Sequence, residues 1–265
     1  MKKGILLAAA ILLSAAGFAQ AQEGELSGTA DLTFLSSYIW RGFDIYSENH
    51  PALQPSIDLN LYDTGLGTKL FFSRPFGDKH ENDEGLFFTL YYGNNIFEGQ
   101  KYATDYKLGW VYYNYPDEPV KAAHMQEFFV SLSWPEMCPA GIVPSYTMAC
   151  MWPAKGGSLV RTNGGWIHIF GLGYDWTIPG FVPETPEQIL HCSLELVYND
   201  GAAPGSVGPA IVDHDWSHAV LGVSTGFKLA EKVTFTPGLY YQLSMDDSVN
   251  DEDEFWLSLG LSYKF

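Results

Sequence analysis

The residues best suited to chemistry lie together in the segment VDHDWSH, which holds Asp213, His214, Asp215, Ser217 and His218. A serine, a histidine and an acid are the parts of a hydrolase, in which the histidine takes the proton of the serine hydroxyl. Two histidines four residues apart share one metal ion only on a helix, and a strand pattern follows this segment. Neither G-x-S-x-G nor H-E-x-x-H occurs in the chain. We therefore expect no catalytic residues, and a hydrolytic site at Ser217, His214 or His218 remains the alternative.

A second group of reactive side chains is the acidic run DDSVNDEDE, residues 246–254. Carboxylates this dense repel one another unless cations intervene, and oxygen ligands suit Mg²⁺ and Ca²⁺. The run lacks the glycine and the spacing of an EF-hand loop. We expect loosely held divalent cations and no cofactor. The weak candidate ligands are Asp246, Asp247, Asp251 and Asp253.

The elements that must position these residues are strands. The last segment, EFWLSLGLSYKF, alternates apolar and other residues with a period of two, as a strand with one apolar face does. Aromatic residues make up 15% of the chain, and no apolar run after the N-terminal one approaches the length of a transmembrane helix. About twelve segments have strand character. Their approximate ranges are 27–40, 53–61, 66–75, 85–95, 102–115, 124–134, 143–151, 165–177, 189–199, 217–228, 232–243 and 254–265.

Charged residues inside these segments indicate which face meets which solvent. A lysine turned toward the middle of a bilayer costs about 2–4 kcal/mol, and an acid costs less, so such residues are expected to point into an enclosed lumen. An even number of strands with distinct apolar and polar faces predicts an all-β fold: a closed, antiparallel, up-and-down transmembrane β-barrel of about twelve strands. The candidate lumen or pore residues are Arg41, Asp58, Lys69, Asp105, Lys107, Glu127 and Glu195.

The N-terminus reads as a secretory signal peptide. Lys2 and Lys3 precede an apolar run from Ile5 to Leu13, and small residues end it at Ala21. This predicts a signal peptide over residues 1–21 and one barrel domain over residues 22–265. Without the signal peptide, the chain has 12 basic and 31 acidic residues, which gives a formal charge of −19. Such a charge makes nucleic acid an unsuitable partner and cations suitable ones.

The connections predict an orientation. Long acidic connections alternate with tight turns such as YDTG and LAEK, the asymmetry of outer-membrane barrels. Two connections expected at the turn side, PEMCPAG and IPGFVPETPEQ, are longer than this pattern predicts. Phe265 is expected to face lipid beside the first strand, and a terminal Phe resembles the assembly signal of such proteins. Aromatic residues expected in the interfacial girdles are Trp40, Tyr115, Trp134, Trp152, Trp176 and Trp216.

The first hairpin carries the motif S-x-Y-x-x-R-G, Ser36 through Tyr38 to Arg41 and Gly42, followed by PALQ at residues 51–54 and by Asp58. In this stretch of about thirty residues the chain resembles the TorF-type porin family of bacterial outer-membrane β-barrels. The resemblance implies a pore-like barrel and little about cargo. Arg41 is expected to brace the loop by pairing with one of three acids. These are Asp44, Glu48 and Asp58.

Together these observations predict a passive channel for small hydrophilic solutes in the outer membrane of a Gram-negative-type bacterium. Its expected partners are membrane lipid, those solutes, and divalent cations at the acidic loops. The alternatives are the rim hydrolase above and a structural or adhesive barrel with a sealed lumen. Aromatic residues expected to narrow the lumen are Phe87, Tyr91, Tyr113 and Tyr240. Three cysteines cannot all pair within one chain, and Cys138 lies too far along an extended strand from Cys150 to bridge it.

Overall fold

A computed structural model describes residues 25–76, 83–157, 160–182, 185–205 and 211–265. The predicted signal peptide, residues 1–21, lies outside the described residues. Every long element is a strand, and among the described residues no helix is long and apolar enough to span a membrane. The strands are β1 Ser27–Leu35, β2 Ile39–Trp40, β3 Phe43–Asp44, β4 Ala52–Asn60, β5 Leu66–Pro75, β6 Gly85–Ile96, β7 Thr104–Asn114, β8 Met125–Ser133, β9 Ile142–Pro153, β10 Gly165–Val182, β11 Thr185–Asp200, β12 His214–Thr225, β13 Phe227–Ala230, β14 Val233–Ser244 and β15 Glu254–Lys264.

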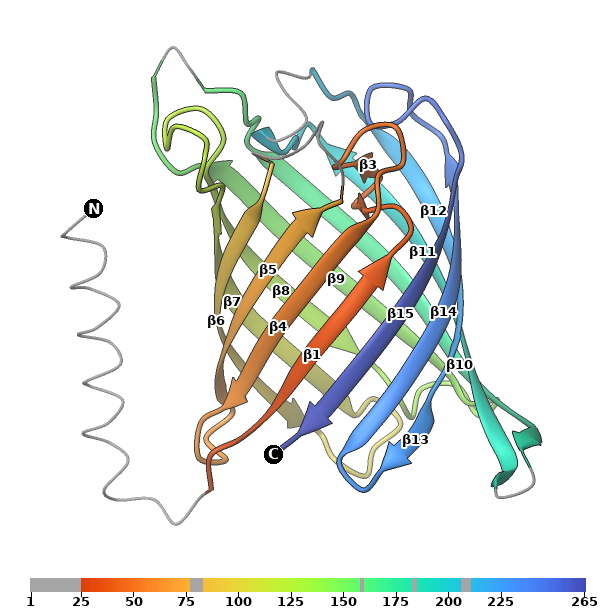
Figure 1. Ribbon diagram of the computed structural model, residues 1–265. Coiled ribbons are helices and arrows are strands. Elements are labelled where there is room, and N and C mark those ends of the chain that lie inside the picture. The colour runs from red at the N-terminus through yellow and green to blue at the C-terminus, as the bar shows by residue number, and fades with distance from the viewer. Residues whose placement is uncertain (1–24, 77–82, 158–159, 183–184, 206–210) are drawn as a thin grey trace.

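The strands form a closed antiparallel barrel with twelve positions (Figure 1). Each long strand pairs with its sequence neighbour, β1 pairs with β15, and β12 pairs with β14 to complete the ring. The short β13 continues the course of β12 after Gly226 and pairs with β14. The prediction of a closed up-and-down barrel of about twelve strands is confirmed.

The outward face of the barrel is a continuous apolar belt. Directly paired residues point to the same side of a sheet, so a row can be followed from strand to strand. Leu194 pairs with Leu221, which pairs with Tyr241, and these side chains are 37–55% exposed. Apolar side chains this exposed in every part of the wall match what transmembrane barrels present to hydrocarbon.

Phe265 belongs to this outward face, as its place in the alternation predicted. Its side chain is 42% exposed, and its ring stacks on that of Tyr263. Its backbone N–H and C=O each bond Gly28 at 3.1 Å, extending the β1–β15 pairing by one residue pair.

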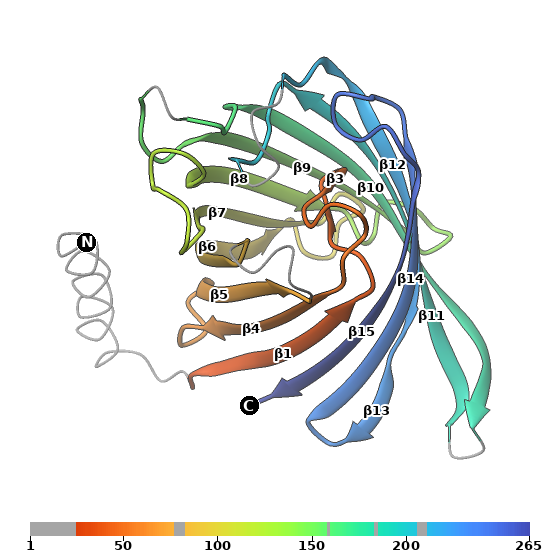
Figure 2. The same cartoon turned by 45° about the horizontal axis from the view of Figure 1, so that its top comes forward.

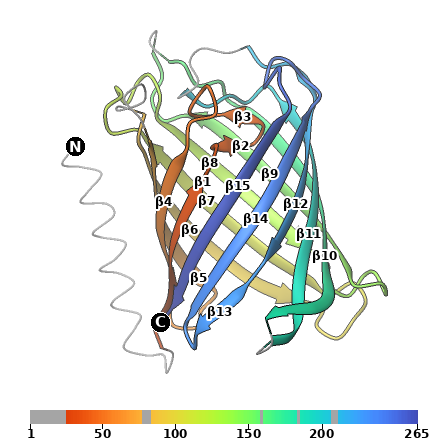
Figure 3. The ribbon, with the colours of Figure 1, turned by 45° about the vertical axis from the view of Figure 1, so that its right-hand side comes forward.

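We call the end of the barrel with the connections 36–51, 76–84, 115–124, 154–164, 201–213 and 245–253 the loop end, and the other the turn end. At the turn end the prediction of a long loop at IPGFVPETPEQ was wrong. Residues from this stretch extend β10 to Val182 and begin β11 at Thr185. β9 pairs with β10 only as far as Tyr174. Beyond that residue, β10 and β11 project together as a two-stranded ribbon below the rim (Figures 1 and 3).

The core of the protein lies inside the barrel at the loop end. The connection 36–51, which contains β2 and β3, turns into the ring of strands (Figure 2). We call residues 36–51 the plug loop. Its Tyr38, Phe43 and Tyr46 are at most 7% exposed and pack with Trp256 of β15. A second buried cluster covers the inner wall from β6 to β11, with Trp40 of the plug loop packed against it.

Candidate functional site in the barrel lumen

Arg41 of the plug loop pairs with Glu127 on the inner face of β8. Its two guanidinium nitrogens donate to the two carboxylate oxygens at 2.6 and 2.8 Å, a two-bond, charge-assisted contact. The side chain of Glu127 is 2% exposed and that of Arg41 is 15% exposed. The expected partners Asp44, Glu48 and Asp58 were wrong choices, because the loop folds inward across the lumen and brings Arg41 to the far wall.

The surroundings of this ion pair are apolar and aromatic. The Tyr113 hydroxyl donates to Glu127 at 2.8 Å, and the guanidinium of Arg41 lies 3.3 Å from the sulfur of Met151. The same guanidinium sits 4.7 Å from the ring centroid of Trp40. Burial lowers the pKa of Arg41, but the carboxylate of Glu127 outweighs burial and holds that pKa above its usual value. The charges are therefore retained in a setting where losing either partner is costly.

Two further contacts hold the plug loop to other walls. The amide of Gln242 on β14 donates to the carbonyl of Gly42 at 2.9 Å. The hydroxyl of Tyr46 donates to that of Ser73 on β5 at 2.9 Å. The loop is thus fixed to the lumen wall at β5, β8 and β14, which lie on different sides of the ring.

Gly42 is required where the plug loop turns. Its φ is +94°, and a Cβ atom built there would lie 2.6 Å from Nδ1 of His218 and 2.6 Å from a methyl carbon of Val249. The residue beside it, Arg41, also has a positive φ of 51°. The turn that delivers Arg41 to Glu127 therefore depends on the absence of a side chain at position 42.

We expect Gly42→Ala to loosen the plug loop and to expose the Arg41–Gly42 peptide bond. The measurement is the rate of tryptic cleavage after Arg41, followed by mass spectrometry on folded protein in detergent. Gly99→Ala is the matched control, because Gly99 has a similar φ of +72° but no heavy atom within 4 Å of a built Cβ. Equal cleavage rates in the two variants would show that the contact with His218 and Val249 does not hold the loop.

Two other loop-end connections, 201–213 and 245–253, share a buried cluster with the plug loop. Ala203 is fully buried, and its backbone bonds that of Asn163 in both directions at 3.1 Å. Arg161 pairs with Glu118 at 2.6 Å, which joins the connections 154–164 and 115–124. The loop end of the lumen is thus packed with side chains from several connections.

The turn-end half of the lumen has a different lining. On the inner faces of β8 to β12 the side chains are small and mostly hydroxylated or absent, as the pairing of Ser131 with Thr147 and of Gly171 with Ser145 shows. The hydroxyls of Ser131 and Thr147 bond each other at 2.8 Å. Glu195 shares this inner face, because it pairs with Gly171 and Val220, and it is exposed. This part of the wall is smooth and hydrophilic.

The facing wall carries most of the remaining charges. Asp58 pairs with Lys69 in the β4–β5 register, and its carboxylate accepts a 2.6 Å hydrogen bond from Tyr91. The ammonium of Lys107 lies 4.4 Å from the ring centroid of the same tyrosine. Asp105 is two residues nearer the turn-end rim on β7 and is exposed.

The structure thus separates the seven candidate lumen residues into groups. Arg41 and Glu127 meet within the packed loop-end half. Asp58, Lys69 and Lys107 share one wall around Tyr91, with Asp105 nearer the rim, while Glu195 lies on the wall across from them, within electrostatic reach of Arg41. Their contribution to conduction stays a prediction.

The four aromatic residues expected in the lumen lie on the inner face. Two residues that were expected in the interfacial girdle also lie inside the barrel. Phe87 and Tyr113 are in the buried cluster, and Tyr240 stacks on Trp256. Trp40 and Tyr115, by contrast, were expected at the interface. Trp40 packs 5.7 Å from Tyr113 inside the barrel, and Tyr115 is 4% exposed.

Sequence reasoning missed Met151 and Gln242 as partners of the plug loop. The alternation of β9 and β14 places both on inner faces, and that signal was present. The alternation does not indicate which inner-face residues a loop from elsewhere in the chain contacts.

The residues of the hydrolase alternative do not form a catalytic arrangement. The Ser217 hydroxyl lies 2.9 Å from Nδ1 of His218 and 3.2 Å from the carbonyl of Val197, to which it donates. Both residues are at most 2% exposed. His214 is at the loop-end rim, where Nδ1 contacts a carboxylate oxygen of Asp200. Because both side chains are buried, a substrate does not reach the serine hydroxyl in this structure.

Two of the weak candidate metal ligands accept hydrogen bonds from residues nearby in the sequence. Asp253 accepts hydrogen bonds from the Tyr241 hydroxyl and from the Ser244 N–H, which hold the pKa of its carboxyl below the usual value. Asp246 accepts from the N–H of Ser248. Asp247 and Asp251 lie in the same connection. No cluster of three metal-ligating side chains occurs among the residues the structure describes.

The three cysteines, Cys138, Cys150 and Cys192, are free, as the spacing of the first two predicted.

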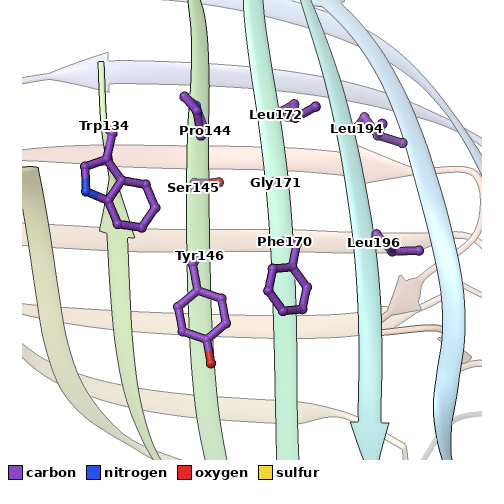
Figure 4. Close-up of a pocket in the computed structure, with 9 residues that line it drawn as sticks. All are labelled: Trp134, Pro144, Ser145, Tyr146, Phe170, Gly171, Leu172, Leu194 and Leu196. Atoms are coloured by element: carbon purple, nitrogen blue, oxygen red, sulfur yellow. The ribbon is translucent and has the colours of Figure 1, made fainter. Parts of the chain in front are cut away.

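One apolar depression of about 670 Å³ lies in the wall between the end of β8 and β11 (Figure 4). Among the side chains that line it, Tyr146, Phe170 and Leu172 belong to the outward row of β9 and β10. Because its lining belongs mainly to the outward face, the depression is separate from the lumen.

Comparison with known proteins agrees with this architecture. No protein-family model and no curated protein matches the chain, so the resemblance to the TorF-type porins stays a prediction. Among solved structures, the KdgM porin in complex with disordered oligogalacturonate is similar with a TM-score of 0.51 and 8% identity, over 90% of this chain and 99% of that one. The NanC porin gives a TM-score of 0.50 and 8% identity, over 91% of this chain and 100% of that one. The COG4313 outer membrane channel from Pseudomonas putida F1 gives a TM-score of 0.50 and 12% identity, over 91% of this chain and 96% of that one. The chain therefore has the closed-barrel fold seen in outer-membrane porins and channels.

Proposed function

We propose that the protein is a channel in the outer membrane of a Gram-negative-type bacterium and that it lets small hydrophilic solutes diffuse passively. The observation that carries the proposal is the lining of the turn-end half. Glycines and hydroxylated side chains such as Ser131, Thr147 and Ser193 line an arc from β8 to β12, and charged residues line the facing wall. Small side chains leave room inside a twelve-strand barrel, which larger ones could nearly fill.

The plug loop is the constriction of this channel in our proposal. Because it is fixed at β5, β8 and β14, passage through the loop end depends on its displacement. Hydrophilic solutes and membrane lipid are the partners that follow from the proposal. Divalent cations at the acidic connection 245–253 remain a weaker part of it.

A structural or adhesive barrel with a sealed lumen is the second candidate. The observation that favours it is the packing of several connections at the loop end, including the buried Ala203 and the Arg161–Glu118 ion pair. In that case the exposed loop-end surface would carry the function, and the hydroxylated lining would have none.

The test is conductance and solute flux with purified protein whose folding is first verified by heat-modifiable migration in a gel. We expect discrete conductance steps in planar bilayers and osmotic swelling of liposomes with small sugars. Heat-denatured protein is the control. Folded protein that gives neither signal, even when the Arg41–Glu127 pair is removed, would favour the sealed barrel and overturn the channel.

A further inference from the structure

The charges facing the turn-end half of the lumen do not balance. Strand pairing assigns four acids and two bases to the inner faces there. Thr29 pairs with Asp58, which places Asp31, two residues further along β1, on the inner face as well. The arginine of the plug loop adds nothing to this sum, because Glu127 neutralises it. The acids are Asp31, Asp58, Asp105 and Glu195, and the bases are Lys69 and Lys107.

Both lysines lie on one wall, where acids offset them. Lys69 is paired in register with Asp58. Lys107 stands over the ring of Tyr91, whose hydroxyl donates to the same aspartate. Asp105 is two residues from Lys107 on the inner face of β7. This wall is therefore close to neutral overall.

Glu195 faces that wall and forms no ion pair among the described residues, and the nearby charge of Arg41 is already paired with Glu127. In the order of strands around the ring, β11 lies six positions from β5, which carries Lys69. The residues paired with Glu195 are Gly171 and Val220, and Gly222 and Ser193 are close on the same inner face. Within the described residues no basic side chain comes within 4.0 Å of its carboxylate. An exposed carboxylate among side chains this small projects its charge into the lumen.

The charges at the two ends of the barrel do not reverse the net negative charge of the lumen lining. At the turn end, the inner faces add Lys228 and Lys264, but also Asp175 and Glu187 on the projecting ribbon. At the loop end, the connection 245–253 carries exposed acids. A cation entering from either side meets a potential that favours it over an anion.

We propose that the lumen selects cations over anions, that its solutes are small cationic or neutral hydrophilic molecules, and that Glu195 is the main specificity-determining residue. This rests on the proposed channel function.

The test is the zero-current potential across a planar bilayer with a KCl gradient. The dilute side should be at or below about 0.1 M, where the screening length is about 10 Å. We expect wild-type protein to favour K⁺ over Cl⁻. Glu195→Gln should lower the permeability ratio about twofold, and Lys107→Gln should raise it by a similar factor. Glu136→Gln is the matched control, because Glu136 is an exposed acid in the turn-end connection 134–141, outside the barrel wall.

The outcomes distinguish failure of the proposed cation selectivity from failure of the proposed channel function. A channel that prefers Cl⁻, or a ratio that Glu195→Gln leaves unchanged, would overturn the cation selectivity while the channel stands. If wild-type protein stays closed, the measurement is made on the Arg41→Gln/Glu127→Gln double variant, which removes one charge of each sign. Folded double variant without conductance would contradict the proposed function.

Discussion

Glu127→Ala is expected to open the loop end of the barrel. The substitution leaves the guanidinium of Arg41 buried without its carboxylate, and removing one partner of a buried ion pair costs about 3–5 kcal/mol. In wild-type protein that free energy favours the docked plug loop. Its loss therefore shifts the equilibrium between the docked and undocked loop by a factor of about 100 or more. Single-channel recordings should therefore show longer and larger openings than those of wild-type protein.

Glu118→Ala is the matched control for this variant. Glu118 also pairs with an arginine at 2.6 Å, but the pair is about one-third exposed and joins two other connections, 115–124 and 154–164. Partly exposed pairs of this kind contribute at most about 1 kcal/mol. Recordings in which Glu127→Ala and Glu118→Ala behave alike would show that the Arg41–Glu127 pair does not restrain the loop. The neutral double variant at positions 41 and 127 separates loss of the contact from the effect of an unpaired charge.

Leu221→Lys is expected to destabilise the barrel in a bilayer. Leu221 lies near the middle of the outward row of β12 and is 55% exposed between Leu194 and Tyr241. A lysine at the middle of a bilayer costs about 2–4 kcal/mol. Folding into lipid vesicles at a series of urea concentrations should show a free energy of unfolding lower by that amount.

Ser224→Lys is the control for the lipid-facing substitution. Ser224 is on the same strand but on the inner face, where it pairs with Gly238 and an added amine remains hydrated. Equal free energies of unfolding for the two variants would argue against a hydrocarbon environment outside the barrel.

The wall of the barrel could be predicted from the sequence because its alternation is local. Each strand of the ring falls on one of the twelve expected segments, and inner and outer faces follow from a period of two. The ribbon was missed because Pro179 and its neighbouring prolines resemble a loop. Beyond Tyr174, β10 pairs only with β11, so its other edge is free, and an edge strand tolerates a proline that cannot donate a hydrogen bond.

The plug loop could not be predicted because its contacts are far apart in the sequence. The motif ending in Arg41 and Gly42 indicated a loop with an anchoring arginine. Acids within a few residues, such as Asp44, were the natural candidates for its partner. Glu127 is 86 residues away along the chain, and nothing in the local pattern says whether a loop folds into the lumen or away from it.

The attachment of the plug loop leads to an expectation about the assembly of the protein. Gly42 accepts its hydrogen bond from Gln242, a residue 200 positions later on β14, which pairs with β12 in the closed ring. We therefore expect the first connection in the chain to be among the last to dock, because its partner on β14 comes late in the sequence. On this expectation, water fills the loop-end half of the lumen until the ring closes and the plug loop docks.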